Sequence, residues 1–167
     1  GGSIDSGGRY TAPAGAGTDD GVQGLAWSPD KRIVYASSTT GNTDIWIMNP
    51  DGSNRVQLTN SQAADEEPLV SPDGRTIVFV SERDSERTLY RMNIDGSGLR
   101  MVSNGEGRTT CSYFFKGGKK VLYSSTHGGA RECPPNPDFA KYGYVWAVYP
   151  DYDIYTATPD GKNIQNL

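Results

Sequence analysis

The chain has 167 residues, of which 35% are hydrophobic, and it contains 21 glycines and 10 prolines. This length suits one domain, and the abundance of turn formers favours an all-β protein over a helical one. The formal net charge of −4, without a cluster of Lys or Arg, argues against nucleic acid as a partner. No apolar run approaches the roughly 18 residues of a membrane-spanning helix.

Residues 1–21 differ in character from the rest of the chain. They are rich in Gly and Ala, as in Ala12-Pro13-Ala14-Gly15, and contain few side chains that could be buried. This composition predicts a flexible leader or linker. An edge strand that helps to close a ring is the alternative for part of the segment.

The residues that follow predict four short strands separated by turns. The strands cover Gln23–Trp27, Arg32–Ser37, Asp44–Asn49 and Arg55–Thr59. Ser28-Pro29-Asp30-Lys31 joins the first two, because Pro presets the turn angle and Asp can bond its own backbone just beyond. Pro50-Asp51-Gly52 joins the last two, where Gly supplies the positive φ that such turns demand.

The same block of residues returns at intervals of 43 or 44 positions. Asp30 corresponds to Asp73 and Gly52 to Gly96, and a third copy at Gly161 follows after a longer interval that contains an insertion. A period in the low forties, built from short strands and Asp-Gly turns, is typical of a β-propeller blade. The predicted four-stranded blades cover about residues 22–60, 61–103 and 104–167.

Two strands have continuous apolar runs, Ile33-Val34-Tyr35-Ala36 and Ile77-Val78-Phe79-Val80, and Val121-Leu122-Tyr123 matches them in the third unit. Such runs are expected where neighbouring blades cover a strand on both faces. Propellers generally need at least four blades to close. Three blades therefore predict a partial propeller or half of a six-bladed ring, and an isolated chain that is not a stable monomer.

The up-and-down strand order predicts which loops share a face. Turns between strands one and two, and between three and four, lie on one side, and the remaining loops lie on the other. The second face contains Thr39–Thr43, Asn60–Glu67, Glu82–Arg87, Ser103–Thr110 and the insertion Thr126–Tyr152. Irregular loops carry function more often than regular turns do, so this face is the predicted functional face.

The two cysteines both map to this face. Cys111 aligns with Glu67, at the start of the third blade, and Cys133 lies in the insertion. A disulfide between them is therefore predicted, worth about 3 kcal/mol in the chain-entropy model. It would indicate an oxidising compartment. Two unrelated thiols are the alternative.

Three motifs carry a resemblance to a known family. They are the turn Trp27-Ser28-Pro29-Asp30 with its repeat Val70-Ser71-Pro72-Asp73-Gly74, the segment Asp44-Ile45-Trp46-Ile47-Met48-Asn49 with its repeats, and the closing Gln57-Leu58-Thr59. Together they resemble the TolB-type, WD-like β-propeller repeat over about residues 22–167, although Phe115-Lys116-Gly117-Gly118 departs from the turn motif. The resemblance implies a periplasmic or secreted bacterial protein. It also implies a propeller, usually of six or more blades, that binds proteins or envelope components without performing chemistry.

His127 is the only histidine in the chain. A zinc site of the usual type would need more His or Cys ligands, and the sugar lyases that share this propeller use several histidines on a metal. Ser124 and Ser125 lie next to His127 at a strand end, without the context of a nucleophile elbow. A solvent-exposed loop histidine is the default interpretation. The sequence predicts no enzyme, no catalytic or metal site and no cofactor.

Two charged segments each allow two interpretations. Asp65-Glu66-Glu67 could help to bind Ca²⁺ if several blades contributed oxygens, but the other units do not repeat it, which favours a solvated acidic loop. The segment Glu82–Arg87 alternates in charge and predicts a solvated loop with local ion pairs. Arg83 in this segment is a candidate binding residue.

The insertion is the best candidate for a binding surface. Aromatic side chains with a polar tip are common anchors of protein and sugar contacts. Packing of these side chains onto their own blade is the competing interpretation. The predicted binding residues of the insertion are Tyr142, Tyr144, Trp146, Tyr149 and Tyr152.

The leading hypothesis is a non-catalytic protein-binding or scaffolding module of the bacterial envelope or extracellular space. Its expected partner is another protein or further propeller blades, supplied by a homo-oligomer or by the remainder of a longer chain. One alternative is the propeller of a larger prolyl-oligopeptidase-like hydrolase, which requires a catalytic domain elsewhere on the parent chain. Another is a purely structural assembly subunit.

Overall fold

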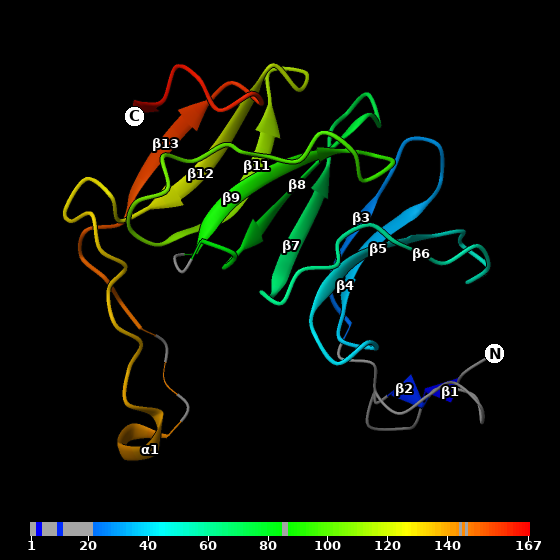
Figure 1. The fold of residues 1–167 in the computed structure, drawn as a ribbon, viewed down its shortest axis with the longest axis horizontal. Coiled ribbons are helices and arrows are strands. Elements are labelled where there is room, and N and C mark those ends of the chain that lie inside the picture. The colour runs from blue at the N-terminus through cyan, green and yellow to red at the C-terminus, as the bar shows by residue number, and fades with distance from the viewer. Residues whose placement is uncertain (1–2, 5–9, 12–21, 85–86, 144, 146) are drawn as a thin grey trace.

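Three sheets lie in chain order across the molecule (Figure 1). The structure, a computed structural model, describes residues 3–4, 10–11, 22–84, 87–143, 145 and 147–167. Each of the three sheets has four strands, and neighbours in the sheet are antiparallel and consecutive in the sequence. The predicted all-β fold with three four-stranded blades is confirmed.

The blades share one strand order, from the first strand to the last. Blade 1 contains β3 (Gln23–Trp27), β4 (Ile33–Ser37), β5 (Asp44–Met48) and β6 (Val56–Gln57). Blade 2 contains β7 (Asp65–Val70), β8 (Thr76–Ser81), β9 (Thr88–Asn93) and β10 (Arg100–Met101). Blade 3 contains β11 (Thr109–Phe115), β12 (Lys120–Ser125), β13 (Asp153–Ala157) and β14 (Gln165–Asn166).

The fourth strand of each blade is only two residues long, shorter than the predicted Arg55–Thr59. In blade 1 a side-chain hydroxyl takes the place of a further backbone hydrogen bond next to β6. Thr59 Oγ1 accepts the backbone N–H of Ile45 in β5 at 2.9 Å. Ser103 Oγ accepts the N–H of Leu89 at 3.0 Å in the same way in blade 2. The hydroxyl satisfies the donor that a longer strand would otherwise pair.

The turn between the first and second strands keeps its form where the sequence departs from the repeat. In blade 2, the N–H of Gly74 donates to the carbonyl of Ser71 at 2.8 Å. In blade 3, the N–H of Gly118 donates to the carbonyl of Phe115 at 3.2 Å. Both glycines have positive φ, 73° and 84°, which is the conformation that glycine adopts without steric penalty. In blade 1 the N–H of Lys31 makes the same bond to the carbonyl of Ser28 at 2.9 Å, with a φ of 67°. The turn therefore needs a residue with positive φ at this position, which glycine supplies in blades 2 and 3.

A β-bulge interrupts the first strand of every blade, which the sequence pattern did not reveal. The register shifts within β3, β7 and β11. The residues with positive φ at these shifts are Gly24, Glu67 and Cys111, at 62°, 53° and 52°. A bulge leaves one residue unpaired and redirects the strand. Glu67 and Cys111 are thereby held at equivalent positions on neighbouring blades, as their alignment predicts.

The hydrophobic core lies between the blades. Along β8, Ile77 and Phe79 pack towards blade 1, whereas Val78 and Val80 pack towards blade 3. Each of these four side chains is at most 1% exposed. This explains the continuous apolar run of β8, because successive side chains of a strand point to opposite faces. The first cluster also contains Ala26, Val34, Ala36, Ile45, Ile47, Tyr90 and Met92. The second also contains Leu89, Val102, Val121, Tyr123, Tyr155 and Ala157.

The outer face of blade 1 carries large apolar side chains. Trp27 lies opposite Ile33 in the register and is 65% exposed. Ile33 and Tyr35 stand 44 positions before Ile77 and Phe79, the residues that blade 2 buries against blade 1. Ile33 is half-buried and Tyr35 is only 5% exposed, so the open apolar surface of blade 1 consists of Trp27 and of Leu25, which is 66% exposed.

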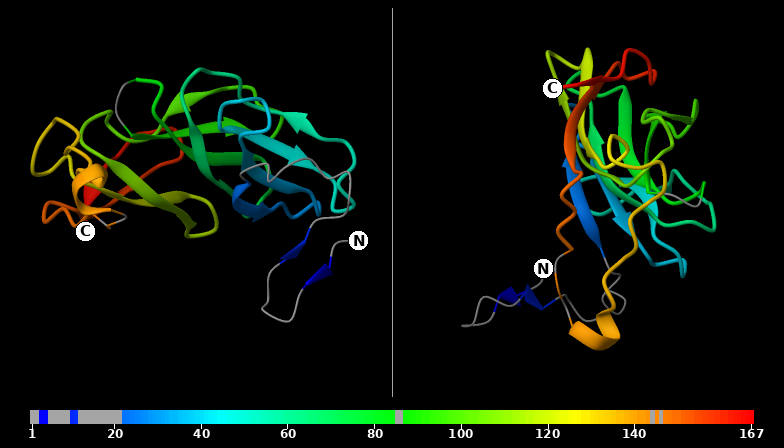
Figure 2. Two further views of the ribbon diagram at one scale, coloured as in Figure 1. Left: turned by 90° about the horizontal axis from the view of Figure 1, so that it is seen from below. Right: turned by 90° about the vertical axis from the view of Figure 1, so that its left-hand side faces the viewer.

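Two segments lie outside the blades. Ser3–Ile4 (β1) pairs antiparallel with Tyr10–Thr11 (β2), and the rest of the predicted leader lies outside the described residues. The insertion between β12 and β13, residues 126–152, is here called the arm. It projects away from the sheets and contains the short helix α1 (Phe139–Tyr142), as Figures 1 and 2 show. No helix in the described part of the chain is long and apolar enough to cross a membrane.

Candidate binding pocket between the arm and the propeller

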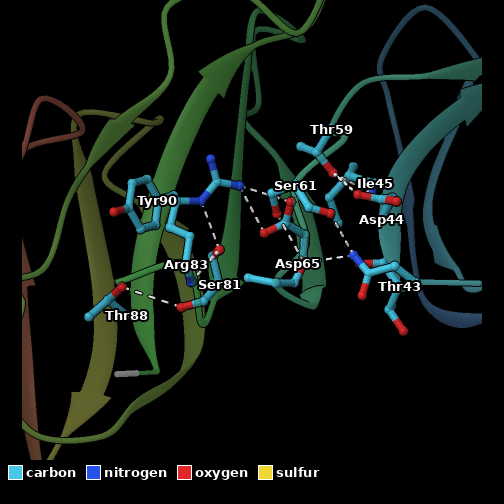
Figure 3. A network of polar contacts seen from close by, with 12 residues as sticks. Thr43, Asp44, Ile45, Thr59, Ser61, Asp65, Ser81, Arg83, Thr88 and Tyr90 are labelled. Atoms are coloured by element: carbon cyan, nitrogen blue, oxygen red, sulfur yellow. Dashed lines mark hydrogen bonds and ion pairs between the residues drawn. The ribbon is translucent and has the colours of Figure 1, made fainter. Parts of the chain in front are cut away.

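A buried ion pair joins the loop after β8 to the start of blade 2 (Figure 3). One Arg83 nitrogen donates to both carboxylate oxygens of Asp65, at 2.9 and 2.8 Å. The Asp65 side chain is fully buried, and the Arg83 side chain is 18% exposed. Arg83 also donates to Ser81 Oγ at 2.9 Å and lies 4.8 Å from the ring centre of Tyr90. The structure thus places Arg83, a predicted binding residue, in an internal network.

The neighbouring arginine neutralises the rest of the acidic triplet. Arg87 donates to Glu66 at 2.8 Å and to Glu67 at 2.7 Å. The segment Asp65-Glu66-Glu67 is therefore not a solvated acidic loop. Arg83 and Arg87 both reach back to this segment, and Arg87 also keeps a local ion pair with Glu82 at 3.6 Å, as predicted for Glu82–Arg87. The two guanidiniums occupy the carboxylates that a Ca²⁺ site would use. Among the described residues, no group of three or more His, Cys, Asp and Glu side chains is placed to hold a metal ion.

Asp44 lies on the blade 1 side of the same network (Figure 3). It is buried, and its carboxylate accepts hydrogen bonds from Thr59 Oγ1 at 3.2 Å and Gln57 Nε2 at 3.0 Å. Burial raises the pKa of Asp44 above its usual value, with the charge of Asp65 acting in the same direction, and outweighs these hydrogen bonds. The folded protein therefore holds the proton of Asp44 more tightly than the unfolded chain does.

This shift predicts a pH dependence. The contribution of Asp44 to stability is greatest below its ordinary pKa of 3.8 and falls as the pH rises above that value. We expect the stability of the wild type relative to Asp44→Asn to decrease from about pH 3.5 to about pH 7, as measured by urea denaturation. Asp51→Asn is the control, because the hydroxyl of Ser53 lowers the pKa of Asp51 and so reverses the expected slope. The prediction is contradicted if the free energy of unfolding of the wild type, relative to that of Asp44→Asn, stays constant or rises with pH.

Glu67 links the starts of blades 2 and 3. From its bulge, its carboxylate accepts the backbone N–H of Cys111 at 3.2 Å and the hydroxyl of Thr110 at 3.3 Å. The same carboxylate binds Arg87. Burial alone would lower the pKa of Arg87, but the hydrogen bonds and charges of Glu66 and Glu67 outweigh it and raise that pKa. The polar wall beside the arm is thus fixed by bonds between blades.

A pocket of about 390 Å³ lies between this wall and the arm. The propeller wall is polar, and the arm supplies most of the apolar wall. The propeller contributes Glu67, Arg87, Arg108, Thr110 and Cys111. The arm contributes Asn136, Pro137, Phe139, Val145, Ala147, Tyr149 and Tyr152. A concave site that combines apolar surface with a few convergent polar groups is the usual form of a ligand pocket.

The predicted aromatic residues are divided among three environments. Tyr149 and Tyr152 line the pocket with their ring centres 5.9 Å apart, and the Tyr149 hydroxyl donates to the carbonyl of Pro135 at 2.9 Å. Tyr142 is 59% exposed in α1 and is not a pocket residue. Tyr144 and Trp146 lie outside the described residues.

The arm is attached to the propeller by polar contacts. The N–H of Gly107 donates to the carbonyl of Arg131 at 2.6 Å, and the Arg131 side chain pairs with Glu106 at 2.8 Å. These bonds make the connection that a disulfide was expected to make, and the structure contains no disulfide between Cys111 and Cys133. Cys111 faces the pocket from its bulge, whereas Cys133 is not among the lining residues.

His127 is not the solvent-exposed loop residue that the sequence suggested. Its ring centre lies 3.9 Å from that of Tyr155, and its Nδ1 lies 2.8 Å from Ser125 Oγ. Burial lowers the pKa of His127. Ser125 is fully buried, so its hydroxyl is out of reach of a substrate in solution. The contacts of His127 assign it a packing role.

Comparison with known proteins agrees with the geometry of the blades. The TolB beta propeller domain family matches residues 17–135, which is more than half of the chain. The chain belongs to this family. It is 45% identical over 76 residues to the protein TolB homolog of Chlorobaculum tepidum, covering 46% of this chain and 17% of that protein. An uncharacterized protein of Agrobacterium fabrum is 28% identical over 113 residues, which covers 67% of this chain and 39% of that protein.

A solved structure shows the same fold. TolB from Acinetobacter baumannii superposes with a TM-score of 0.68 at 21% identity, over 90% of this chain and 33% of that one. This TolB family member thus spans well under two thirds of the relatives that it matches. The family match ends at residue 135, so most of the arm lies beyond it. The pocket therefore combines propeller residues inside the family match with arm residues that lie beyond it.

Arg108 and Asn136, which the pocket brings together, carry no distinctive sequence pattern. Arg108 Nη1 donates to Asn136 Oδ1 at 3.1 Å across 28 residues of sequence. Arg108 lies within the predicted functional segment Ser103–Thr110, but no local pattern distinguishes it from the other arginines. Its role depends on the path of the arm.

Proposed function

We propose that this TolB family propeller is a non-catalytic protein-binding module of the bacterial envelope or the extracellular space, and that the arm and its pocket form the contact surface. The observation that carries the proposal is the pocket that the arm builds against the start of blades 2 and 3. Family membership supports a binding role and the envelope location. Of the predicted binding residues, Tyr149 and Tyr152 line the pocket and Tyr142 lies in α1 of the arm.

The exposed apolar side chains of the arm also support this proposal. Val148 is 89% exposed, Tyr142 is 59% exposed and Phe139 is 50% exposed. Apolar and aromatic side chains that gather on one projecting segment are typical of protein contact sites. The arm thus presents anchors to a partner beside the pocket.

Site-specific photocross-linking in cells of the source organism tests the proposal. A photoreactive amino acid at Val148 should capture a partner, whereas the same group at Lys119, on the opposite face, should not. Lys119 is the matched control because it is also exposed and lies in a turn between the first two strands of blade 3. Equal capture from both positions, or capture from neither, contradicts the proposal.

Assembly with further blades is a second candidate function, favoured by the outer face of blade 1. The exposed Trp27 lies beside Ile33 and Tyr35, which repeat the residues that blade 2 buries. We propose that another blade covers this face, from a second copy or from a longer chain. This role does not compete with binding at the arm, because the two surfaces are on different blades.

A further inference from the structure

The two arginines of the pocket differ in what they already bind. Arg87 has three glutamates within ion-pair distance, Glu66 at 2.8 Å, Glu67 at 2.7 Å and Glu82 at 3.6 Å. In the described part of the chain, no carboxylate lies within that distance of Arg108. The charge of Arg87 is therefore cancelled within the protein, and the charge of Arg108 is not.

Contacts from the arm hold Arg108 in place. Its Nη1 donates to Asn136 Oδ1 at 3.1 Å. Its backbone N–H donates to Thr126 Oγ1 at 2.9 Å. A guanidinium has five N–H donors in a rigid fork, so the hydrogen bond to Asn136 leaves donors for a ligand. The fork matches the two oxygens of a carboxylate.

The opposite wall of the pocket is apolar and partly open to solvent. Phe139 is 50% exposed and Val145 is 37% exposed, and Pro137 and Ala147 extend this surface. A ligand that binds Arg108 can therefore place an apolar group on the arm at the same time. The protein carries a net charge of −4, so an acidic partner is repelled by most of the surface. Within the pocket, complementary charge then favours contact of a carboxylate with Arg108, because the other pocket arginine, Arg87, is already paired.

We propose that the pocket recognises a peptide segment in which a carboxylate binds Arg108 and a neighbouring apolar side chain packs on Phe139 and Val145. The inference rests on the proposed function, since it takes the pocket as the surface that meets the partner. The carboxylate is supplied either by an Asp or Glu side chain or by the C-terminus of the partner.

Selection from randomised peptides tests the chemistry and separates the two sources. One decapeptide library has amidated C-termini and the other has free C-termini, and both are selected on the wild-type protein and on Arg108→Gln. Enrichment of Asp or Glu next to an apolar residue in the amidated library identifies a side-chain carboxylate. Enrichment confined to the free-ended library identifies the C-terminus. Absence of any acidic or terminal preference on the wild type overturns the proposal.

The strongest selected peptide is then compared with a copy that has an amide in place of its carboxylate. By fluorescence anisotropy, we expect the amide copy to bind the wild type about tenfold or more weakly. Arg108→Gln should weaken binding of the acidic peptide by a similar factor. It should also remove the difference in affinity between the acidic peptide and its amide copy. The matched control is Arg75→Gln, at an exposed arginine in the turn between β7 and β8 that neither lines the pocket nor contacts the arm. If Arg108→Gln leaves the preference for the acidic peptide intact, the inference is wrong.

Alkylation of Cys111 provides a second readout that does not depend on folding differences between variants. The thiol is exposed and lines the pocket, so the bound peptide should slow its reaction with iodoacetamide. An unchanged rate at saturating peptide places the binding site elsewhere and overturns the inference.

Cross-linking at Val148 separates the failure of this inference from the failure of the proposed function. Cross-linking that persists in Arg108→Gln would leave the arm as the contact surface and reject only the role of a carboxylate. If the photoreactive group at Val148 captures no partner in the wild-type protein, the proposed function itself is rejected.

Discussion

Replacing Arg83 with Met is expected to lower the free energy of unfolding by about 3–5 kcal/mol, the range found when one partner of a buried ion pair is removed. The Asp65 side chain has no exposed surface, and Arg83 donates to both of its oxygens. Without the guanidinium, the charge of Asp65 would stay buried and unpaired, which is the most costly state for an ionised group. Urea denaturation at a fixed protein concentration measures the loss.

Two control variants separate the buried charge from other effects of the substitution. Arg32→Met breaks an exposed ion pair with Asp30 and should cost no more than about 1 kcal/mol. Adding Asp65→Leu to Arg83→Met should recover part of the loss, because the double variant leaves no charge behind. A loss for Arg83→Met as small as that for Arg32→Met would show that the pair does not stabilise the fold.

Replacing Phe79 with Ala is expected to destabilise the protein by about 3–5 kcal/mol. Phe79 has no exposed surface and stacks on Tyr90 with ring centres 6.1 Å apart, in the core between blades 1 and 2. Removing it leaves a cavity between two sheets, which could fill it only by moving closer together and disturbing the rest of the core. Urea denaturation at a fixed protein concentration again provides the measurement, and a loss below about 1 kcal/mol would contradict the packing described here.

Trp27→Ala is the matched control for Phe79→Ala, because Trp27 is also a large aromatic residue but is 65% exposed. In an isolated chain of three blades its removal should change stability by no more than about 1 kcal/mol. If another blade covers the outer face of blade 1, Trp27→Ala should instead destabilise the assembly by an amount close to that for Phe79→Ala. Light scattering on the same samples identifies the assembly, since the single chain has a mass of 18.1 kDa.

The repeat made the fold predictable from the sequence. Asp73 and Gly96 repeat Asp30 and Gly52, and each pair marks a turn whose backbone chemistry is local. The apolar run of β8 predicted burial on both faces, and the two clusters on either side of it confirm this. Turn residues and strand periodicity act over a few positions, so their signals are readable without the tertiary structure.

The roles of the charged residues and of the arm were decided only by the tertiary structure. The sequence allowed Asp65 to be a Ca²⁺ ligand or a solvated acid, and only the fold shows that it pairs with Arg83 across 18 positions. Arg108 meets Asn136 across 28 positions because the arm passes beside the start of blade 3 before it projects away from the sheets. Local propensity determines turns and strands, but the partner of a side chain depends on which distant segments the packed blades bring within hydrogen-bonding distance.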